Sequence, residues 1–380
     1  MSLYLDHAAT TPLAERVWEA MRPYLEPGGV HANPASDHEA GAEAARAVDA
    51  ARAQVAAAIG AQPEEIVFTS GATEANNLAL KGSIAFLGGG HVVTTRTEHR
   101  AVLDVAQHLA TEGSPVSFVD PEPDGTVSAD AVIAALRPDT ALVSVMWVNN
   151  ETGAINPVAA IAAACAERGI RFHCDAAQAL GRLAIDVREM PVALLSLSAH
   201  KCYGPKGIGA LFVRRRPRAR VAAQLQGGGH EQGMRSGTLA THQIVGFGVA
   251  ANVAAAQQAA DEAHARTLAT RLRAGLAALP GLLVNGDPAR CVPHIVNVAF
   301  DGLHGEALRA ATAELAVASG SACSAAHAES SYVLRALGRT DRQAAAALRI
   351  STGRGTQAED IDRALEVIRS AVMRLRAMAA

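Results

Sequence analysis

Phe172-His173-Cys174-Asp175-Ala176-Ala177-Gln178 and Ser198-Ala199-His200-Lys201 are the two stretches that decide the fold of this chain. Each stands at the end of a short apolar run that is typical of a buried strand. An aspartate on one strand and a lysine after a later one form the pair that pyridoxal phosphate requires: the lysine forms a Schiff base with the aldehyde, and the carboxylate keeps the pyridine nitrogen protonated. An isolated lysine and aspartate would more often be a surface residue and a helix cap, so the interpretation depends on the surrounding pattern.

Short β-rich runs alternate with alanine-rich helical stretches before this pair and around it. The predicted strands lie at 66–69, 91–94, 141–145, 170–173, 194–197 and 209–213. This alternation predicts an α/β protein with a mainly parallel sheet formed by about residues 60–215. A long helix is predicted around 241–278, and the strands expected at 282–284 and 295–298 begin a separate α+β unit. We expect the domain boundary to lie within that helix.

The composition is that of an ordinary soluble protein. The 380 residues are 49% hydrophobic and 19% charged, with a formal charge of −3. Aromatic residues make up only 3% of the chain, too few for the stacking platforms of single-stranded nucleic-acid binders. There is no signal peptide pattern and no apolar stretch long enough to cross a bilayer, so we expect a cytoplasmic protein with no membrane or direct nucleic-acid contact. The five scattered cysteines indicate neither a disulfide framework nor a zinc site, and no metal is expected.

Several polar side chains directly follow predicted strands, where ligands gather in open α/β sheets. Ala72 and Thr73 would open a helix whose free backbone N–H groups suit a phosphate, although such a turn often serves only as a cap. His99 could stack on a flat cofactor and move protons, or be a structural histidine. Asn150 could offer its amide to a carboxylate or to the ring hydroxyl, or belong to an Asx turn. Gln178, one helical turn beyond Asp175, could reach a cofactor oxygen.

Taken together, the motifs resemble the class V aminotransferase group of pyridoxal-phosphate enzymes, and within it the cysteine desulfurases of the NifS/IscS type. The matching segments are 4–12, 33–36, 68–74, 200–207, 227–231, 234–238 and 319–323, in the same order along nearly the whole chain. The resemblance implies the fold of type I pyridoxal-phosphate transferases, with a mainly parallel seven-stranded sheet in a large domain and a smaller α+β domain. Residues 13–258 would form the large cofactor-binding domain, and residues 1–12 and 259–380 the small one.

The resemblance also assigns roles to individual residues. Lys201 would carry the cofactor, Asp175 would pair with the pyridine nitrogen, Gln178 would contact the ring hydroxyl and His99 would stack over the ring. The phosphate would be held by Ala72, Thr73, Ser198 and His200. Thr238 would reach the phosphate of the neighbouring subunit's cofactor, which implies a homodimer. Asn150 and Arg349 would receive the substrate carboxylate, which a guanidinium binds well through two parallel hydrogen bonds.

Cys323 would complete the chemistry as the sulfur acceptor. It lies in the small-residue segment Ser319-Gly320-Ser321-Ala322-Cys323, whereas the other four cysteines are expected in helices or strands as buried packing residues. In the implied reaction Lys201 removes the Cα proton of L-cysteine, the Cys323 thiolate attacks the substrate sulfur, and the products are a persulfide on Cys323 and L-alanine. His99 would exchange the proton of the substrate thiol. A selenocysteine lyase, another aminotransferase of this fold and a non-catalytic assembly protein are the alternatives.

Three departures bear on the partners. The chain stops shortly after its last expected helix, whereas the housekeeping iron–sulfur desulfurases continue into a tail that docks the cluster scaffold. Trp147 replaces a histidine common in close relatives. The sequence of residues 324–328, directly after Cys323, also differs from the usual family pattern. The sulfur acceptor is therefore open between an iron–sulfur scaffold, a tRNA or cofactor thiolation enzyme and a DNA-phosphorothioation protein. The arginine-rich run 214–220 is interpreted as a solvated turn, with an acidic protein partner as the alternative.

Overall fold

The computed structural model describes residues 2–318 and 330–379. Its largest sheet has seven strands in the order β2-β8-β7-β6-β5-β3-β4. These strands are β2 (Ile66–Thr69), β3 (His91–Thr95), β4 (Val116–Val119), β5 (Thr140–Ser144), β6 (Arg171–Asp175), β7 (Leu194–Ser198) and β8 (Gly209–Val213). All neighbours pair in parallel except β8, which is antiparallel to both β2 and β7. The predicted mainly parallel α/β sheet is confirmed.

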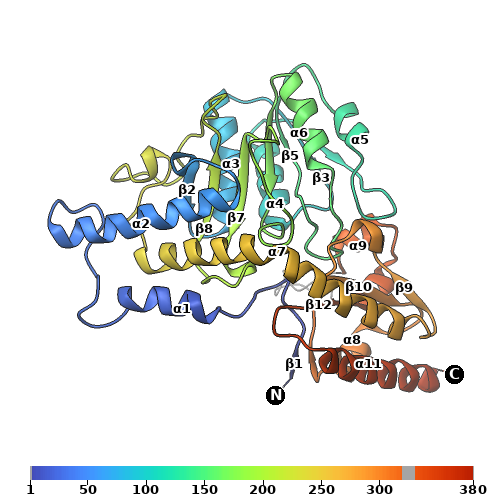
Figure 1. The fold of residues 1–380 in the computed structure, drawn as a ribbon. Helices are drawn as coiled ribbons and strands as arrows, with labels where there is room; N and C mark the ends of the chain where they lie inside the picture. The colour runs from blue at the N-terminus through green and yellow to red at the C-terminus, as the bar shows by residue number, and fades with distance from the viewer. Residues whose placement is uncertain (1, 319–329, 380) are drawn as a thin grey trace.

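Helices cover both faces of this sheet, as the buried strands of a parallel sheet require (Figure 1). Successive side chains of β2 show why: Ile66 and Phe68 enter one apolar cluster, and Val67 enters another. The first cluster includes residues of α2 (Glu39–Ala58), α6 (Val158–Glu167) and the first half of α7 (Thr241–Leu276). The second includes residues of α3 (Ala72–Leu87) and α4 (Arg100–Thr111). The strands are therefore apolar on both sides.

A second, antiparallel sheet forms in the later part of the chain. Its order is β12-β10-β9, from β12 (Ala347–Ser351), β10 (Ile295–Phe300) and β9 (Leu282–Val284). Its core includes residues from α11 (Ala358–Ala379), α8 (Gly305–Ala311) and the second half of α7. Within α7, Phe247 and Ala251 belong to the core of the large sheet, whereas Leu268 and Leu272 belong to this one. The helix thus continues from one core into the other (Figure 1).

The chain's first residues join the two parts. The short strand β1 (Leu3–Tyr4) pairs in parallel with β11 (Leu315–Ala316). A few residues later, the Thr11 amide donates to the carbonyl oxygen of His200 at 2.9 Å, beside β7. Residues 5–11 therefore run between the small sheet and the end of the large one.

Two details differ from the sequence predictions or extend them. The edge strand β4 was not among the strands that the pattern predicted, because Val116, Ser117 and Phe118 are only half-buried and show no clear periodicity. The long helix expected around 241–278 is α7, which ends at Leu276. Among residues 2–318 and 330–379, no helix is both long and apolar enough to span a membrane.

Candidate active site

A cavity of about 510 Å³ opens at the carboxyl ends of the large sheet's parallel strands. The structure brings together nine of the predicted site residues along its wall: Ala72, Thr73, His99, Asn150, Asp175, Gln178, Ser198, His200 and Lys201. They come from the ends of β2, β3, β5, β6 and β7, or from the loops and helices that follow. The edge of the sheet thus gathers them, as expected for an open α/β fold.

Asp175 is the last residue of β6, and its carboxylate is held from two sides. Its Oδ1 accepts a hydrogen bond from the Ala177 amide at 2.9 Å, and its Oδ2 accepts one from the Asn76 side chain at 2.7 Å. The residue is only 5% exposed. Sequence reasoning missed Asn76, although it lies three positions after Thr73 in the same helix and therefore on the same face. The two donors fix the direction in which this carboxylate can meet a cationic partner.

Lys201 ends the short helix η3 (Ala199–Lys201) that follows β7. Its Nζ donates to the carbonyl oxygens of Ala8 and Ala9, at 2.6 and 2.7 Å. The Ala8 carbonyl also accepts a hydrogen bond from the side chain of Gln178, at 2.7 Å. The amine is thus aligned by the backbone of the N-terminal segment, a contact that sequence spacing does not reveal.

The wall between α3 and η3 fits a phosphate. The helix α3 is 16 residues long and begins at Ala72, so its first amides point outward without helical partners. Among the described residues, the buried Ser198 hydroxyl is one of the polar atoms with no hydrogen-bond partner. The pKa of His200 is lowered to about 4, first by burial and then by Lys201 and Lys206, so its ring is neutral at pH 7. These groups, with an aligned lysine and a buried carboxylate, fit pyridoxal phosphate.

His99 caps the start of α4. Its Nδ1 accepts a hydrogen bond from the Ala101 amide at 3.1 Å. An accepting Nδ1 carries no proton, so the neutral ring has its proton on Nε2. The capping interaction therefore assigns the tautomer and makes Nε2 the ring's donor.

Two of the remaining predicted residues do not line the cavity. Arg349, on β12, is buried and donates to the carbonyl oxygen of Asn150 at 2.8 Å and to Asp6 Oδ1 at 2.6 Å. Its Nε is buried with no hydrogen-bond partner. Thr238 is exposed and does not line this cavity. Cys323 lies outside the described residues. Trp147 is also absent from the cavity wall, although both of its neighbours line it.

Sequence reasoning gave no role to Glu98, which is fully buried beside His99. Its Oε1 accepts hydrogen bonds from the Met146 amide at 2.7 Å and from the Thr95 hydroxyl at 3.1 Å. Its Oε2 has no partner in the described part of the chain. Burial, with a smaller contribution from Asp175, raises the pKa of Glu98 to about 8. A protonated Glu98 thus ties the end of β3 to the residues after β5.

In Glu98→Gln, the free energy of unfolding is expected to decrease less steeply with rising pH than in the wild type. The pKa of Glu98 is about 8 in the folded protein against an ordinary 4.5, so the folded state binds more protons between these values. Stability from this group is complete below about pH 4.5 and is lost as pH rises through 8. The test is urea unfolding of both cofactor-saturated proteins from pH 5 to 8. The free energy of unfolding of the variant should rise relative to that of the wild type by up to about 1.4 kcal/mol per pH unit. A pH-independent difference would contradict this.

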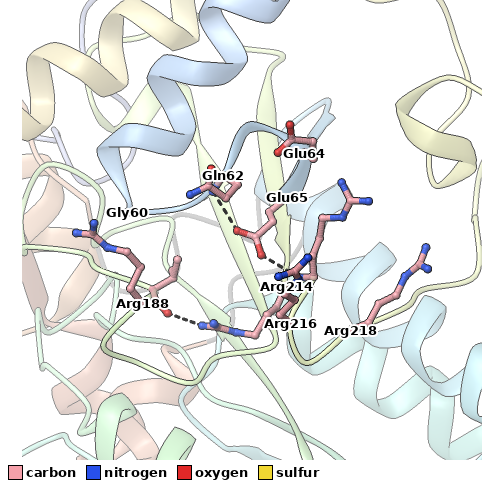
Figure 2. A pocket seen from close by; sticks show the side chains of 10 residues that line it. Gly60, Gln62, Glu64, Glu65, Arg188, Arg214, Arg216 and Arg218 are labelled. Atoms are coloured by element: carbon pink, nitrogen blue, oxygen red, sulfur yellow. Dashed lines mark hydrogen bonds between the residues drawn. The ribbon is translucent and has the colours of Figure 1, made fainter.

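A second cavity, of about 530 Å³, shares no lining residue with the first. Figure 2 shows it from close by. Arg188, Arg214, Arg216 and Arg218 line it together with Glu64 and Glu65. The Arg214 side chain donates to the carbonyl oxygens of Val187, Met190 and Val192, so its guanidinium binds the protein's own backbone. Arg214, the first residue of the arginine-rich turn predicted at 214–220, therefore has a structural role.

Comparison with known proteins agrees with this geometry. The aminotransferase class-V family model matches residues 3–364. A protein of Methylococcus capsulatus named cysteine desulfurase IscS is 52% identical over 379 residues, which cover 99% of this chain and 94% of the relative. A solved NifS-like protein superposes with a TM-score of 0.91 at 31% identity, over 99% of this chain and 100% of that one. The structure described as SspA in complex with cysteine superposes with a TM-score of 0.82 at 37% identity, over 93% and 99% of the two chains.

The family match extends over nearly the whole chain, and the cavity is lined by a lysine, an aspartate and a helix start. The seven-stranded sheet has the type I architecture of the solved relatives. The chain belongs to the class V aminotransferase family of pyridoxal-phosphate-dependent enzymes.

Proposed function

We propose that this protein is a cysteine desulfurase that converts L-cysteine to L-alanine and moves the sulfur to Cys323 as a persulfide. One observation carries the proposal: Lys201, Asp175 and His99 meet in one cavity of a chain that is 52% identical to a protein named cysteine desulfurase. The SspA structure with cysteine supports the same substrate. Pyridoxal phosphate, when bound, supplies the electron sink for loss of the Cα proton.

Different residues around the cavity bind the cofactor and transfer protons. Asp175, fixed by Asn76 and Ala177, holds a proton on the pyridine nitrogen. Lys201 takes the Cα proton of the substrate, since its amine becomes a general base once it is no longer bonded to the cofactor. His99 has its donor proton on Nε2 and exchanges it with the substrate sulfur. The helix start at Ala72 and Thr73, with Ser198 and His200, holds the phosphate.

The substrate carboxylate is received by Arg349 and Asn150. The Nε of Arg349 is a buried donor without a partner among the described residues, so the guanidinium retains hydrogen-bonding capacity for a carboxylate. The amide of Asn150 would contribute its donor, Nδ2, because its oxygen only accepts. A buried polar atom without a partner costs free energy, which a bound carboxylate would recover at the guanidinium. Arg349 already contacts the backbone of Asn150, so the two groups act from one location.

Cys323 is the proposed sulfur acceptor, and the four described cysteines are poor candidates. Burial raises the pKa of Cys165, Cys202 and Cys291 to about 12, and raises that of Cys174 well above its ordinary value. Cys291 lies in a loop and is partly exposed, unlike the buried helical or strand position predicted for it. In the transfer, the Cys323 thiolate forms an S–S bond as the C–S bond of the substrate breaks, and the carbon keeps the bonding pair and is protonated to alanine.

The assembly and location of the enzyme are part of the same proposal. Residues 13–258 form the cofactor-binding domain, and residues 1–12 and 259–380 form the small domain. A homodimer brings Thr238 of each subunit to the phosphate site of the other, which fits its exposure and its absence from the cavity wall of its own subunit. The enzyme works in the cytoplasm and passes its persulfide to an iron–sulfur scaffold, a thiolation enzyme or a DNA-phosphorothioation protein.

Purified protein given L-cysteine and a thiol reductant is expected to release alanine and sulfide in equal amounts. One sulfur leaves for each alanine formed, because the reductant cleaves each persulfide before the next turnover. Amino-acid analysis and a sulfide assay measure the two products. A keto acid in place of alanine would indicate an aminotransferase. Turnover of selenocysteine with none of cysteine would indicate a selenocysteine lyase.

A further inference from the structure

The described residues on both sides of Cys323 are attached to residues of the proposed active site. Before it, Ala318 exchanges two backbone hydrogen bonds with Arg349, at 2.7 and 3.2 Å. After it, the Ser331 hydroxyl donates to Glu151 Oε2 at 2.5 Å. The hydroxyl of Tyr332 donates to the carbonyl oxygen of Glu98 at 2.6 Å. Ala318 and Ser331, which are 13 positions apart in the sequence and flank Cys323, are therefore both attached to residues of this site.

Glu151 is a buried carboxylate that the proposed chemistry does not use. It is 6% exposed, and its backbone is fixed from two sides: its amide donates to Asn149 Oδ1 at 2.9 Å, and its carbonyl accepts from Asn297 Nδ2 at 2.9 Å. Burial raises its pKa to about 7, against the opposing influence of Ser331, Arg349, His99 and Arg100. A carboxyl group whose backbone is held from two sides, near the guanidinium groups of Arg349 and Arg100, is a defined anchor point.

Ser331 uses both capacities of its hydroxyl. Its oxygen accepts a hydrogen bond from the Leu334 amide at 3.1 Å, which caps the start of α9 (Tyr332–Ala336). Its proton is donated to Glu151. Capping needs only the oxygen of the hydroxyl, whereas the proton donated to Glu151 connects the start of α9 to the loop that carries Asn150. Ser331 is 2% exposed, so water does not substitute easily for either partner.

We propose that Glu151 and Ser331 are positioning residues for the transfer of sulfur to Cys323. Their hydrogen bond fixes the chain eight residues after Cys323 next to Asn150, while Ala318 fixes it five residues before. Eight residues span at most about 29 Å and five at most about 18 Å, so both attachments restrict the volume open to the thiol. A smaller volume means a higher effective concentration at the substrate sulfur. The inference rests on the proposed desulfurase function.

The proposal separates two steps of one turnover. Cysteine binding and removal of its Cα proton use Lys201, Asp175 and Arg349, none of which bonds to Ser331. Formation of the persulfide needs Cys323 at the substrate. Loss of the Glu151–Ser331 contact is therefore expected to slow the second step selectively.

The test measures both steps in one experiment. Holoenzyme is mixed with L-cysteine without reductant; the change in cofactor absorbance reports cysteine binding, and alkylation with mass spectrometry of quenched samples reports persulfide on Cys323. In Ser331→Ala, Ser331→Gly and Glu151→Ala we expect the persulfide to form about 10-fold more slowly, while the absorbance change stays within about twofold of wild type. Glycine is tolerated at a helix N-cap at a cost of a few tenths of a kcal/mol, so Ser331→Gly separates lost positioning from lost capping.

Three further variants sharpen the result. Glu151→Gln keeps an oxygen that accepts from Ser331, so its persulfide rate should recover most of the loss. The double variant Glu151→Ala/Ser331→Ala should be no slower than either single variant, because both remove one contact. Ser330→Ala is the matched control: the neighbouring hydroxyl donates to Asp341 Oδ1 on the surface, and its loss should change neither step.

The proposal is overturned if persulfide formation is unchanged in Ser331→Gly and Glu151→Ala, or if the absorbance change slows in parallel with it. Multiplicative effects in the double variant would equally overturn the shared contact. A wild-type enzyme that binds cysteine and releases alanine without persulfide on Cys323 would instead refute the proposed function on which the inference rests.

Discussion

Lys201→Ala is expected to lower alanine formation from L-cysteine by about 10³-fold or more. The amine is both the attachment point of the cofactor and the base for the Cα proton, so one substitution removes two functions. The fold should tolerate the change, because the Ala8 carbonyl still accepts a hydrogen bond from Gln178. The assay is alanine release by the variant in the presence of excess cofactor and reductant.

Borohydride reduction followed by peptide mass spectrometry provides the direct readout. The wild-type protein should carry the reduced cofactor on the peptide with Lys201, and Lys201→Ala should carry none. Lys206 lines the same cavity and is the matched control: in Lys206→Ala the label should remain on Lys201. Wild-type turnover in Lys201→Ala, or a label on another lysine in the wild type, would contradict the assignment.

Cys323→Ser is expected to lower the rate of alanine formation by roughly 10³-fold or more, because the substitution removes a catalytic nucleophile. A serine hydroxyl is not ionised at pH 7 and does not attack sulfur, whereas the steps before sulfur transfer do not involve this side chain. Addition of L-cysteine should therefore still change the cofactor absorbance of the variant. Stopped-flow absorbance and alanine release, measured on the same sample, separate the two steps.

Cys291→Ser is the control for this experiment. Cys291 is the one described cysteine that is partly exposed, and its thiol has a pKa raised to about 12 by burial. Its replacement should leave alanine release within about twofold of wild type, since buried thiols are poor nucleophiles. Full activity in Cys323→Ser would remove Cys323 from the reaction and favour the lyase or aminotransferase alternatives.

Much of the site follows from local sequence. A residue that comes just after a predicted strand reaches the carboxyl edge of the sheet, and this rule alone predicts that Asp175, Lys201, His99 and Asn150 lie near one another. The same rule predicts that the helix start at Ala72, which comes just after a predicted strand, lies at this edge of the sheet. The family resemblance then assigns roles that periodicity alone leaves open.

The contacts that sequence missed are those between distant segments. Lys201 Nζ bonds to carbonyl oxygens 192 and 193 residues earlier, and no local pattern indicates which backbone will meet it. Asn76 reaches Asp175 across 99 residues. Glu98 and Glu151 were missed for another reason: glutamates are normally exposed, and their burial depends on partners supplied by other loops.

The path of residues 5–11 has a consequence for how the enzyme is made. The Ser351 hydroxyl donates to the carbonyl of Leu5 and accepts from the amide of Ala8, 343 residues before it. The ribosome adds about 5–20 residues per second and synthesises Ala8 and Ala9, whose carbonyls align the lysine, well before Ser351. The hydrogen bond between the Ala8 amide and Ser351 therefore forms only after the 343 residues of chain between them have been synthesised, so this part of the pocket is completed long after its first residues are made.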